Sequence, residues 1–159
     1  MIITAARSQS LASELQRLLP DVRALIGPGR RCTLVFDRGG YSPAVITETI
    51  ASGFDLLTYD KGSWPRAAVK DVTTVDYQAP DGSKHTYQLA EQQIVLPVPG
   101  RRTVTLRSNI CRSADGHQIP ILTNRTDLTL AQVAYRMGNR WRQENYFNCA
   151  DLRVMPTAA

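Results

Sequence analysis

The sequence predicts an α/β protein, and two observations carry that prediction. Residues 32–59 have the pattern of a strand, a helix and a second strand, which is the order of a parallel βαβ unit. Residues 69–123 change to short strand-like runs separated by turns, which indicates mostly antiparallel β-structure. With 159 residues, of which 43% are hydrophobic, the chain has the size and composition of one globular domain.

The first expected element is an amphipathic helix over residues 8–26, because apolar side chains recur at three- and four-residue steps. These positions are Leu11, Leu15, Leu18, Val22 and Leu25. Gly27-Pro28-Gly29 ends this helix. Residues 32–36 follow as a short apolar run without alternation, which is typical of a strand buried on both faces of a parallel sheet.

The second helix begins at Ser42-Pro43, a favourable N-cap followed by proline at the first helical position, and ends near Ser52. Residues 54–59 form the next buried strand, joined to the first by a crossover that should be right-handed. This arrangement places Asp37 at the carboxyl end of the first strand, the edge of an α/β sheet where ligand sites gather.

The β-rich segment contains five strand-like runs, and Asp81-Gly82 and Asp115-Gly116 are strong signals for hairpin turns between them. The runs are 72–77, 85–89, 94–98, 103–110 and 117–123. A last helix is expected to start near Asp127 or Thr129, with Gly138 as an interior weakness that costs about 1 kcal/mol relative to alanine.

The net charge is +5, and 16 of the 19 basic residues are arginine. Arginine binds phosphate well, but a GC-rich genome also replaces lysine by arginine, so charge alone leaves DNA binding open. We expect a cytoplasmic protein, because the sequence has no secretion signal and no apolar stretch of about 20 residues. Cys32, Cys111 and Cys149 are far apart and are expected to be reduced thiols, not a zinc site.

Two acidic residues are candidates for chemistry. Asp37 ends a buried strand and precedes Arg38 and a Gly-Gly pair, and Glu144 lies one helical turn after Arg140. Considered singly, a strand-end aspartate more often forms a turn, and an i,i+4 Arg-Glu pair is usually a surface ion pair worth about 0.3–0.5 kcal/mol. Their order along the chain is what makes them informative.

The segment VFDRGGYSPAVITETIASGFDLLTYDKGSW resembles the second-aspartate region of bacterial insertion-sequence DDE transposases, and ILTNRTDLTLAQVAYRMGNRWRQENYF resembles their third acidic block. The resemblance covers roughly residues 30–147. It implies a partial RNase H-like fold, a βαβ unit plus a late helix, with residues 30–64 and 124–148 as its elements. Residues 69–123 would be an inserted antiparallel β-rich part, and residues 1–159 together one partial catalytic domain.

The resemblance also implies the site. Asp37 and Glu144 would be the second and third acidic ligands of two Mg²⁺ or Mn²⁺ ions, which activate water or a DNA 3′-hydroxyl for attack on a phosphodiester. Arg38 and Tyr41 would support Asp37. Arg140 would hold Glu144 in position or contact phosphate, and Trp141 would pack into the sheet, which is the stronger expectation, or touch DNA. Arg101, Arg102, Arg107 and Arg112 are candidate contacts to the DNA backbone, with a solvated strand face as the equal alternative.

The chain departs from the family pattern in three places. Met137 and Asp151 occupy the positions of a signature tyrosine and lysine, and the carboxylates before Asp37, Glu14 and Asp21, lie in a helical pattern where the family has its first aspartate on a strand. We therefore expect Mg²⁺ or Mn²⁺ to bind weakly or not at all. Missing strands would leave unpaired strand edges and an uncovered apolar face.

The function that follows is a truncated DDE transposase, inactive alone, whose partners are transposon-end DNA and a second copy or a full-length transposase. It would be associated with the bacterial nucleoid when bound to DNA, and no membrane partner is expected. Two alternatives remain open: a DNA-binding remnant without catalysis, and a self-contained metal-dependent nuclease.

Overall fold

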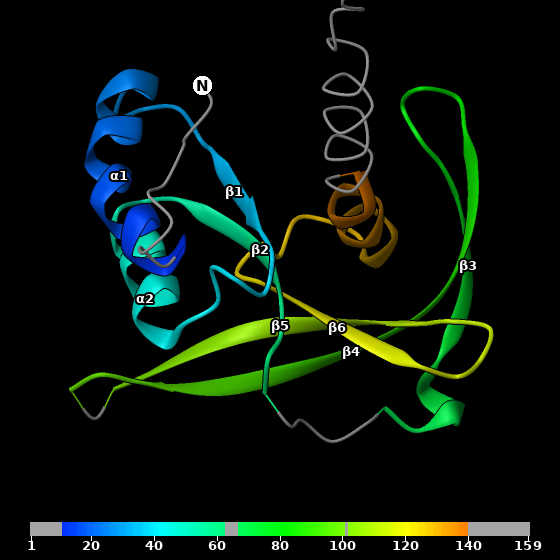
Figure 1. The fold of residues 1–159 in the computed structure, drawn as a ribbon. Helices are drawn as coiled ribbons and strands as arrows, with labels where there is room; N and C mark the ends of the chain where they lie inside the picture. Colours follow the sequence, from blue (N-terminus) through cyan, green and yellow to red (C-terminus); the bar gives the residue numbers. More distant parts are fainter. Residues whose placement is uncertain (1–10, 63–66, 101, 140–159) are drawn as a thin grey trace, which may run out of the picture.

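The computed structural model describes residues 11–62, 67–100 and 102–139, which form a curled mixed sheet with helices on both faces (Figure 1). The sheet has six strands in the order β1-β2-β6-β5-β4-β3. The elements are α1 (Leu11–Ile26), β1 (Thr33–Phe36), α2 (Pro43–Ala51), β2 (Asp55–Tyr59), the 3₁₀ turn η1 (Val69–Asp71), β3 (Thr73–Gln78), β4 (Lys84–Val98), β5 (Arg102–Arg112) and β6 (Gln118–Thr123). A third helix covers residues 130–139.

The predicted βαβ unit is confirmed. β1 and β2 are parallel neighbours in the register Phe36↔Thr58, and α2 connects them. The helix begins where the sequence predicts, because the Ser42 hydroxyl accepts a hydrogen bond of 3.1 Å from the Val45 N–H and Pro43 takes the first turn. Local chemistry therefore determines this part of the fold.

The two faces of β2 are covered by different helices. Leu56 packs with Phe36, Val45 and Ile46 in a cluster beneath α2, to which Leu15 of α1 adds. Leu57 points the other way and packs with the helix of residues 130–139 through Val133 and Met137. The alternation of a strand thus places α1 and α2 on one face of the sheet and the third helix on the other.

The segment 69–123 is antiparallel and β-rich, as predicted, but it is continuous with the rest of the sheet. β6 pairs with β2 on one side and with β5 on the other, so the βαβ unit and the β-rich segment share one sheet. The expected strands 85–89 and 94–98 are a single strand, β4, because the polar residues between them continue the pairing with β5. The hairpin turns contain glycines at positive φ, Gly82 at +83° and Gly116 at +84°, as their sequences predict.

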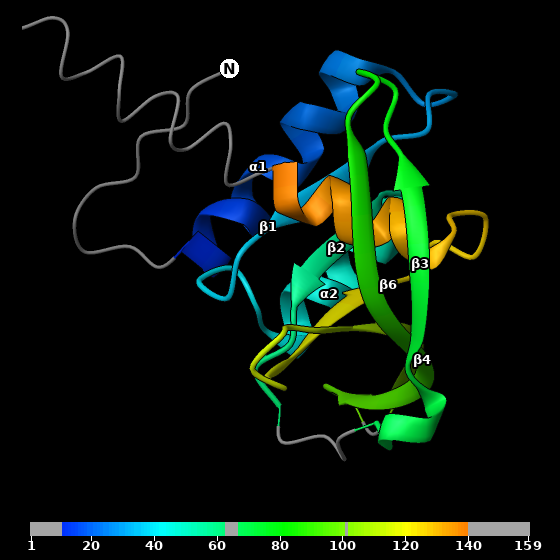
Figure 2. The same cartoon turned by 90° about the vertical axis from the view of Figure 1, so that its right-hand side faces the viewer.

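The third helix begins after Thr129, one of the two predicted start positions. The Thr129 hydroxyl accepts from the Gln132 N–H at 3.2 Å, and the Gln132 side chain accepts from the Thr129 N–H at 2.9 Å, which is a capping box. Ala131 and Ala134 pack against Leu89 of β4, so the helix lies beside β3 and β4 (Figure 2).

Unpaired edges are expected on both sides of the β1–β2 pair, but only the outer edge of β1 has no partner strand within residues 11–62, 67–100 and 102–139, because β2 pairs with β6. Val35 on this edge strand is 38% exposed. The expectation of an uncovered apolar face is wrong for β2, since Leu56 and Leu57 are both completely buried. No helix of the described segments is long and apolar enough to cross a membrane.

Candidate functional site

Two aspartates lie where the two parallel strands end. Asp37 directly follows Phe36 of β1, and Asp60 directly follows Tyr59 of β2. Because Phe36 is in register with Thr58, both aspartates belong to the same edge of the sheet. Strand spacing and rise put their Cα atoms roughly 6 Å apart. The carboxyl edge of β1 and β2 therefore has two acidic side chains, of which the sequence analysis identified only Asp37.

The same turn is built twice at this edge. In Asp37-Arg38-Gly39 the Gly39 N–H donates to the Asp37 Oδ1 at 2.8 Å, and in Asp60-Lys61-Gly62 the Gly62 N–H donates to the Asp60 Oδ1 at 2.7 Å. An aspartate side chain that accepts from the backbone two residues later forms an Asx turn. The turn-forming role considered for Asp37 is thus observed for one of its oxygens. In both turns the residue after the aspartate, Arg38 or Lys61, is basic and exposed.

Asp60 is buried, with 3% of its surface exposed. Its backbone N–H donates to the Pro120 carbonyl at 3.0 Å, which fixes the end of β2 against β6. Its second carboxylate oxygen, Oδ2, is also buried and accepts no close hydrogen bond from a described residue, and the donor that lies beside the carboxylate is the Tyr41 phenol. Leaving a buried acceptor unsatisfied costs about 1–3 kcal/mol, and more when it is charged. Such an oxygen is exceptional in a folded protein.

Tyr41 packs against the apolar cluster beneath α2 and lies next to Asp60. Burial raises the pKa of the Tyr41 phenol to about 12, and the negative charge and hydrogen-bonding of Asp60 raise it further in the same direction. The phenol is therefore protonated at neutral pH and available as a donor near Asp60. Tyr41, which is predicted to support Asp37, therefore lies beside the second aspartate of the same sheet edge.

The turn after Asp37 is held by close packing at Gly40. A Cβ atom at this position would lie 2.8 Å from the Phe36 ring and 2.9 Å from a methyl carbon of Leu15. Both distances are shorter than real Cβ contacts. Glycine is therefore required at this position for the turn to sit against β1 and α1, which fixes the backbone on which Asp37, Arg38 and Tyr41 are carried.

Asp37, Arg38 and Tyr41 share one turn, in which the Tyr41 N–H donates to the Arg38 carbonyl, and Arg102 lies elsewhere, exposed at the start of β5. The other predicted site residues, Glu144, Arg140, Trp141 and Arg101, lie outside the described residues. Arg107 is engaged within the protein: its guanidinium donates to the carbonyls of Arg125 and Leu128 at 2.7 and 2.9 Å and pairs with Glu91. Arg112 donates to the Gln88 side chain at 3.1 Å.

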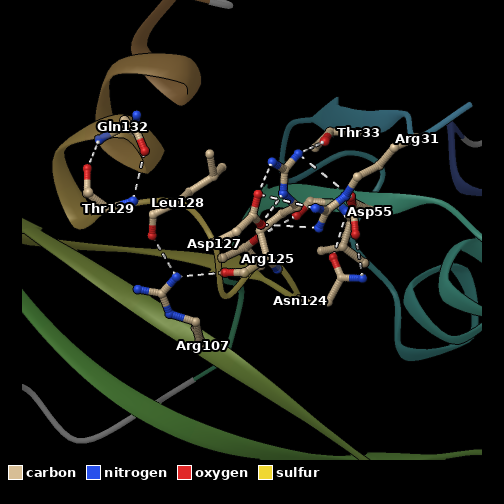
Figure 3. Close-up of polar contacts among 12 residues, drawn as sticks. Arg31, Thr33, Asp55, Arg107, Asn124, Arg125, Asp127, Leu128, Thr129 and Gln132 are labelled. Carbon is tan, nitrogen blue, oxygen red and sulfur yellow. Dashed lines mark hydrogen bonds and ion pairs between the residues drawn. The ribbon is translucent and has the colours of Figure 1, made fainter.

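An ion-pair network lies at the opposite end of β1 and β2, which is their amino end (Figure 3). Arg125 is only 9% exposed and donates to both Asp127 oxygens at 2.7 and 2.6 Å. Arg31 binds Asp55 at 2.6 Å and Asp127 at 3.1 Å. The hydrogen bonds from Arg125 hold the pKa of Asp127 well below its usual range. The sequence analysis did not identify this network, which joins residues from three strand ends.

The carboxyl edge fits a hard divalent cation better than any softer metal, because its donors are carboxylate oxygens. Within the described segments no three His, Cys, Asp or Glu side chains are grouped closely enough to hold a metal ion. Mg²⁺ is commonly bound through one or two carboxylates together with water and substrate phosphates. Asp37, half-buried at the end of β1, offers one such carboxylate, whereas the Asp60 carboxylate is buried beside the Tyr41 phenol.

Comparison with known proteins adds no family to this description. No protein-family model matches the chain, and no curated protein sequence matches it. The chemistry of the site therefore depends on its own residues and on their positions in the sheet.

Proposed function

We propose that this chain is part of a DDE transposase catalytic domain, one that binds DNA, holds a divalent cation only weakly and does not carry out transposition by itself. The observation that carries the proposal is the position of Asp37 at the carboxyl end of β1 in a parallel βαβ unit. Ligands of open α/β sheets bind outside these strand ends. The finer assignment, to a partial RNase H-like fold, belongs to the same proposal.

The position of the third helix supports it. Leu34 and Phe36 face the cluster beneath α2, so alternation assigns position 37 to the other face of the sheet, where the helix of residues 130–139 lies. Glu144 follows the last described residue of that helix by five positions. In the proposed site Asp37 and Glu144 would contribute oxygen ligands to Mg²⁺ or Mn²⁺, and the cation would polarise a phosphodiester.

The carboxylates that precede β1 support the proposal that the chain is inactive by itself. The carboxylates that precede Asp37 in the described segments, Glu14 and Asp21, both lie on α1. Glu14 is buried and paired with Arg17 at 3.0 Å. Neither is placed at a strand end, so no described residue takes the role of a first acidic ligand. Without that ligand the geometry needed for in-line attack is not fixed.

Two assays on the full chain test the proposal. Fluorescence anisotropy with a labelled duplex should show binding that weakens steeply with salt and strengthens in Mn²⁺, and Asp37→Asn should remove the Mn²⁺ effect while leaving the salt effect. A strand-transfer assay should show no product. If the affinity for DNA changes neither with Mn²⁺ nor with Asp37→Asn, the proposal is wrong and the chain is a DNA-binding remnant without catalysis.

The opposite result would also overturn it. Vigorous Mn²⁺-dependent nicking of DNA by this chain alone, abolished by Asp37→Ala and by Glu144→Ala, would identify a self-contained nuclease. Asp76→Asn is a suitable control, because Asp76 is an exposed aspartate of β3 that accepts a hydrogen bond of 2.7 Å from Thr86, far along the sheet from β1.

A further inference from the structure

We infer that Asp60 is a positioning residue for Asp37, which acts through the Tyr41 phenol to hold the turn of residues 37–41 at the carboxyl end of β1. The inference deepens the proposed function and rests on it for the role of Asp37 as a cation ligand. It gives a role to a buried carboxylate that the resemblance to DDE transposases does not supply, and that role is support of the site, not coordination of the cation.

The turn of residues 37–41 is held only weakly by its own backbone hydrogen bonds. The Gly40 N–H donates to the Asp37 carbonyl at 3.2 Å, and the Tyr41 N–H donates to the Arg38 carbonyl at 3.3 Å. Ordinary N–H···O bonds are about 2.9–3.0 Å long and seldom exceed about 3.2 Å. Contacts with the rest of the protein must therefore fix the turn, and with it the direction of the Asp37 side chain.

Two of these contacts have little directional strength. The Thr58 hydroxyl lies 3.4 Å from the Asp37 carbonyl and equally far from the Tyr59 carbonyl, so this bond is long and divided between two acceptors. Gly40 packs closely against the Phe36 ring and α1, and this contact is apolar. Neither contact fixes the orientation of the turn by itself.

The third contact is between the Tyr41 phenol and the Asp60 carboxylate. Tyr41 is partly buried against the apolar cluster beneath α2, so packing restricts its ring. A hydrogen bond to a charged acceptor is roughly twice as strong as one between neutral groups, and the low dielectric constant of a buried site strengthens it further. Tyr41 and Asp60 therefore form the strongest of the three contacts.

Asp60 is a fixed anchor because the sheet holds it. It is 3% exposed, its backbone N–H donates to the Pro120 carbonyl of β6 at 3.0 Å, and its Oδ1 accepts from the Gly62 N–H at 2.7 Å. These bonds join the aspartate both to β6 and to its own turn. Movement of Tyr41 away from Asp60 would break their contact, since the carboxylate cannot follow the phenol.

The two aspartates lie on different faces of the sheet, so Asp60 acts on the site only through the turn. Alternation along β2 places Asp60 on the same face as Leu56, beneath α2, and Tyr41 packs on that face as well. The same alternation along β1 assigns Asp37 to the face of the third helix. The turn therefore crosses the end of the sheet, with the proposed ligand at one end and its anchor at the other.

Matched variants of the full chain separate this role from general destabilisation. Tyr41→Phe removes only the phenolic hydroxyl, Asp60→Ala removes the carboxylate, and Asp60→Asn keeps a side chain of the same shape that can still bond to the phenol. The readout is Mn²⁺ affinity, measured from the broadening of the Gly39 amide signal in nuclear magnetic resonance spectra, because the Gly39 N–H contacts the Asp37 carboxylate.

Tyr41→Phe and Asp60→Ala should each weaken Mn²⁺ binding about tenfold, the lower end of the loss seen when an outer-shell partner of a metal ligand is removed. Asp60→Asn should restore binding to within about twofold of wild type, because an outer-shell partner is then present again. Wild-type affinity in both Tyr41→Phe and Asp60→Ala would overturn the inference. A loss in Asp60→Ala that Tyr41→Phe does not share would also overturn it, because Asp60 would then not act through the phenol.

Tyr77→Phe is the control for the loss of a phenolic hydroxyl, because Tyr77 lies on β3 at the far edge of the sheet. It should leave the Mn²⁺ affinity unchanged. A loss in Tyr77→Phe equal to that in Tyr41→Phe would contradict a specific role for Tyr41 and Asp60.

A second measurement needs no cation and does not depend on the folding of Asp60→Ala. Hydrogen exchange of the buried Gly40 amide, which donates within the turn, should be faster by about tenfold in Tyr41→Phe than in wild type, while the amides of β4 and β5 exchange at unchanged rates. Equal exchange of the Gly40 amide in the two proteins would contradict the inference.

The inference and the proposed function fail in different ways. If Tyr41→Phe speeds the exchange of the Gly40 amide but Mn²⁺ does not broaden the Gly39 signal of the wild-type chain, the proposed function is wrong and the anchoring of the turn by Asp60 stands. If Mn²⁺ binds at Asp37 and neither Tyr41→Phe nor Asp60→Ala changes its affinity, the inference is wrong and the proposed function stands.

Discussion

The acidic side chains at the two ends of the β1–β2 pair have different partners. At the amino end Asp55 and Asp127 both contact arginines, Arg31 and Arg125, and no oxygen of these two carboxylates is buried without a partner (Figure 3). At the carboxyl end Asp60 is more deeply buried than either, and the groups beside its carboxylate are the neutral Gly62 N–H and Tyr41 phenol. The comparison shows that arginines neutralise the acidic side chains at the amino end, whereas neutral donors surround the buried aspartate at the carboxyl end.

The largest expected effect is at the amino end. Arg125→Ala should lower the free energy of unfolding by about 2–4 kcal/mol, because it leaves Asp55 partly buried without one cation and releases Asp127 and Thr33. Urea denaturation measures this. Arg136→Ala, an exposed arginine on the third helix, is the control and should change stability by less than about 0.5 kcal/mol. Equal effects would remove the structural role assigned to this end.

The next largest effect on stability is expected from a change in packing at the turn that carries Asp37. Gly40→Ala should destabilise by about 1–3 kcal/mol, since the added Cβ meets Phe36 and Leu15 at less than 3 Å. Gly29→Ala has nothing within 4 Å of the added atom and should be nearly neutral. Thermal unfolding of both variants makes the comparison. A neutral Gly40→Ala would mean that the turn is not held by this contact.

The same substitution should have a larger effect at the amino end than at the carboxyl end. Asp55→Asn removes an ion-pair partner of Arg31 and should cost about 1–2 kcal/mol, whereas Asp60→Asn removes no ion pair, keeps an acceptor for the Gly62 N–H and should cost less than about 1 kcal/mol. Denaturation in buffer containing a chelator is the measurement, so that no bound cation contributes. Equal destabilisation by both variants would contradict this difference between the two ends.

The smallest effect concerns pH. The pKa of Asp127 is lowered in the folded state by its hydrogen bonds with Arg125, so its contribution to stability is complete above the unfolded-state value near 4 and is lost as pH falls below that value. Stability should therefore decrease between about pH 4 and lower values, and less so in Asp127→Asn. An unchanged pH profile in this variant would show that water screens the pair, since 46% of the Asp127 side chain is exposed.

The elements that sequence predicts well are those set by neighbouring residues. Ser42-Pro43 defines the start of α2, Thr129 and Gln132 cap the third helix, and Asp-Gly pairs form hairpin turns, because each depends on bonds within four residues. The joining of β6 to β2 is a pairing between distant segments, and no local pattern specifies it. The resemblance predicts the β-rich part as an insertion, and only the structure shows that its last strand pairs with β2.

The candidate site was predictable in part. Asp37 is identified by its place at the end of an apolar strand, but Asp60 resembles an ordinary turn residue, and its burial, its bond to Pro120 of β6 and its interaction with Tyr41 are seen only in the structure. One sequence signal could have found it, namely the recurrence of aspartate, a basic residue and glycine after each parallel strand. Arg107 is a predicted DNA contact, but its guanidinium donates to two carbonyls of the loop of residues 124–129. No local sequence pattern predicts this internal role.

The most direct measurement of the difference between the two ends is the position of Mn²⁺ in crystals of the full chain, located by anomalous diffraction. An ordered ion at the carboxyl end of β1, bonded to an oxygen of Asp37, is the predicted result. An ion bound at Asp127 instead, or no ordered ion at this edge at saturating Mn²⁺, would contradict it.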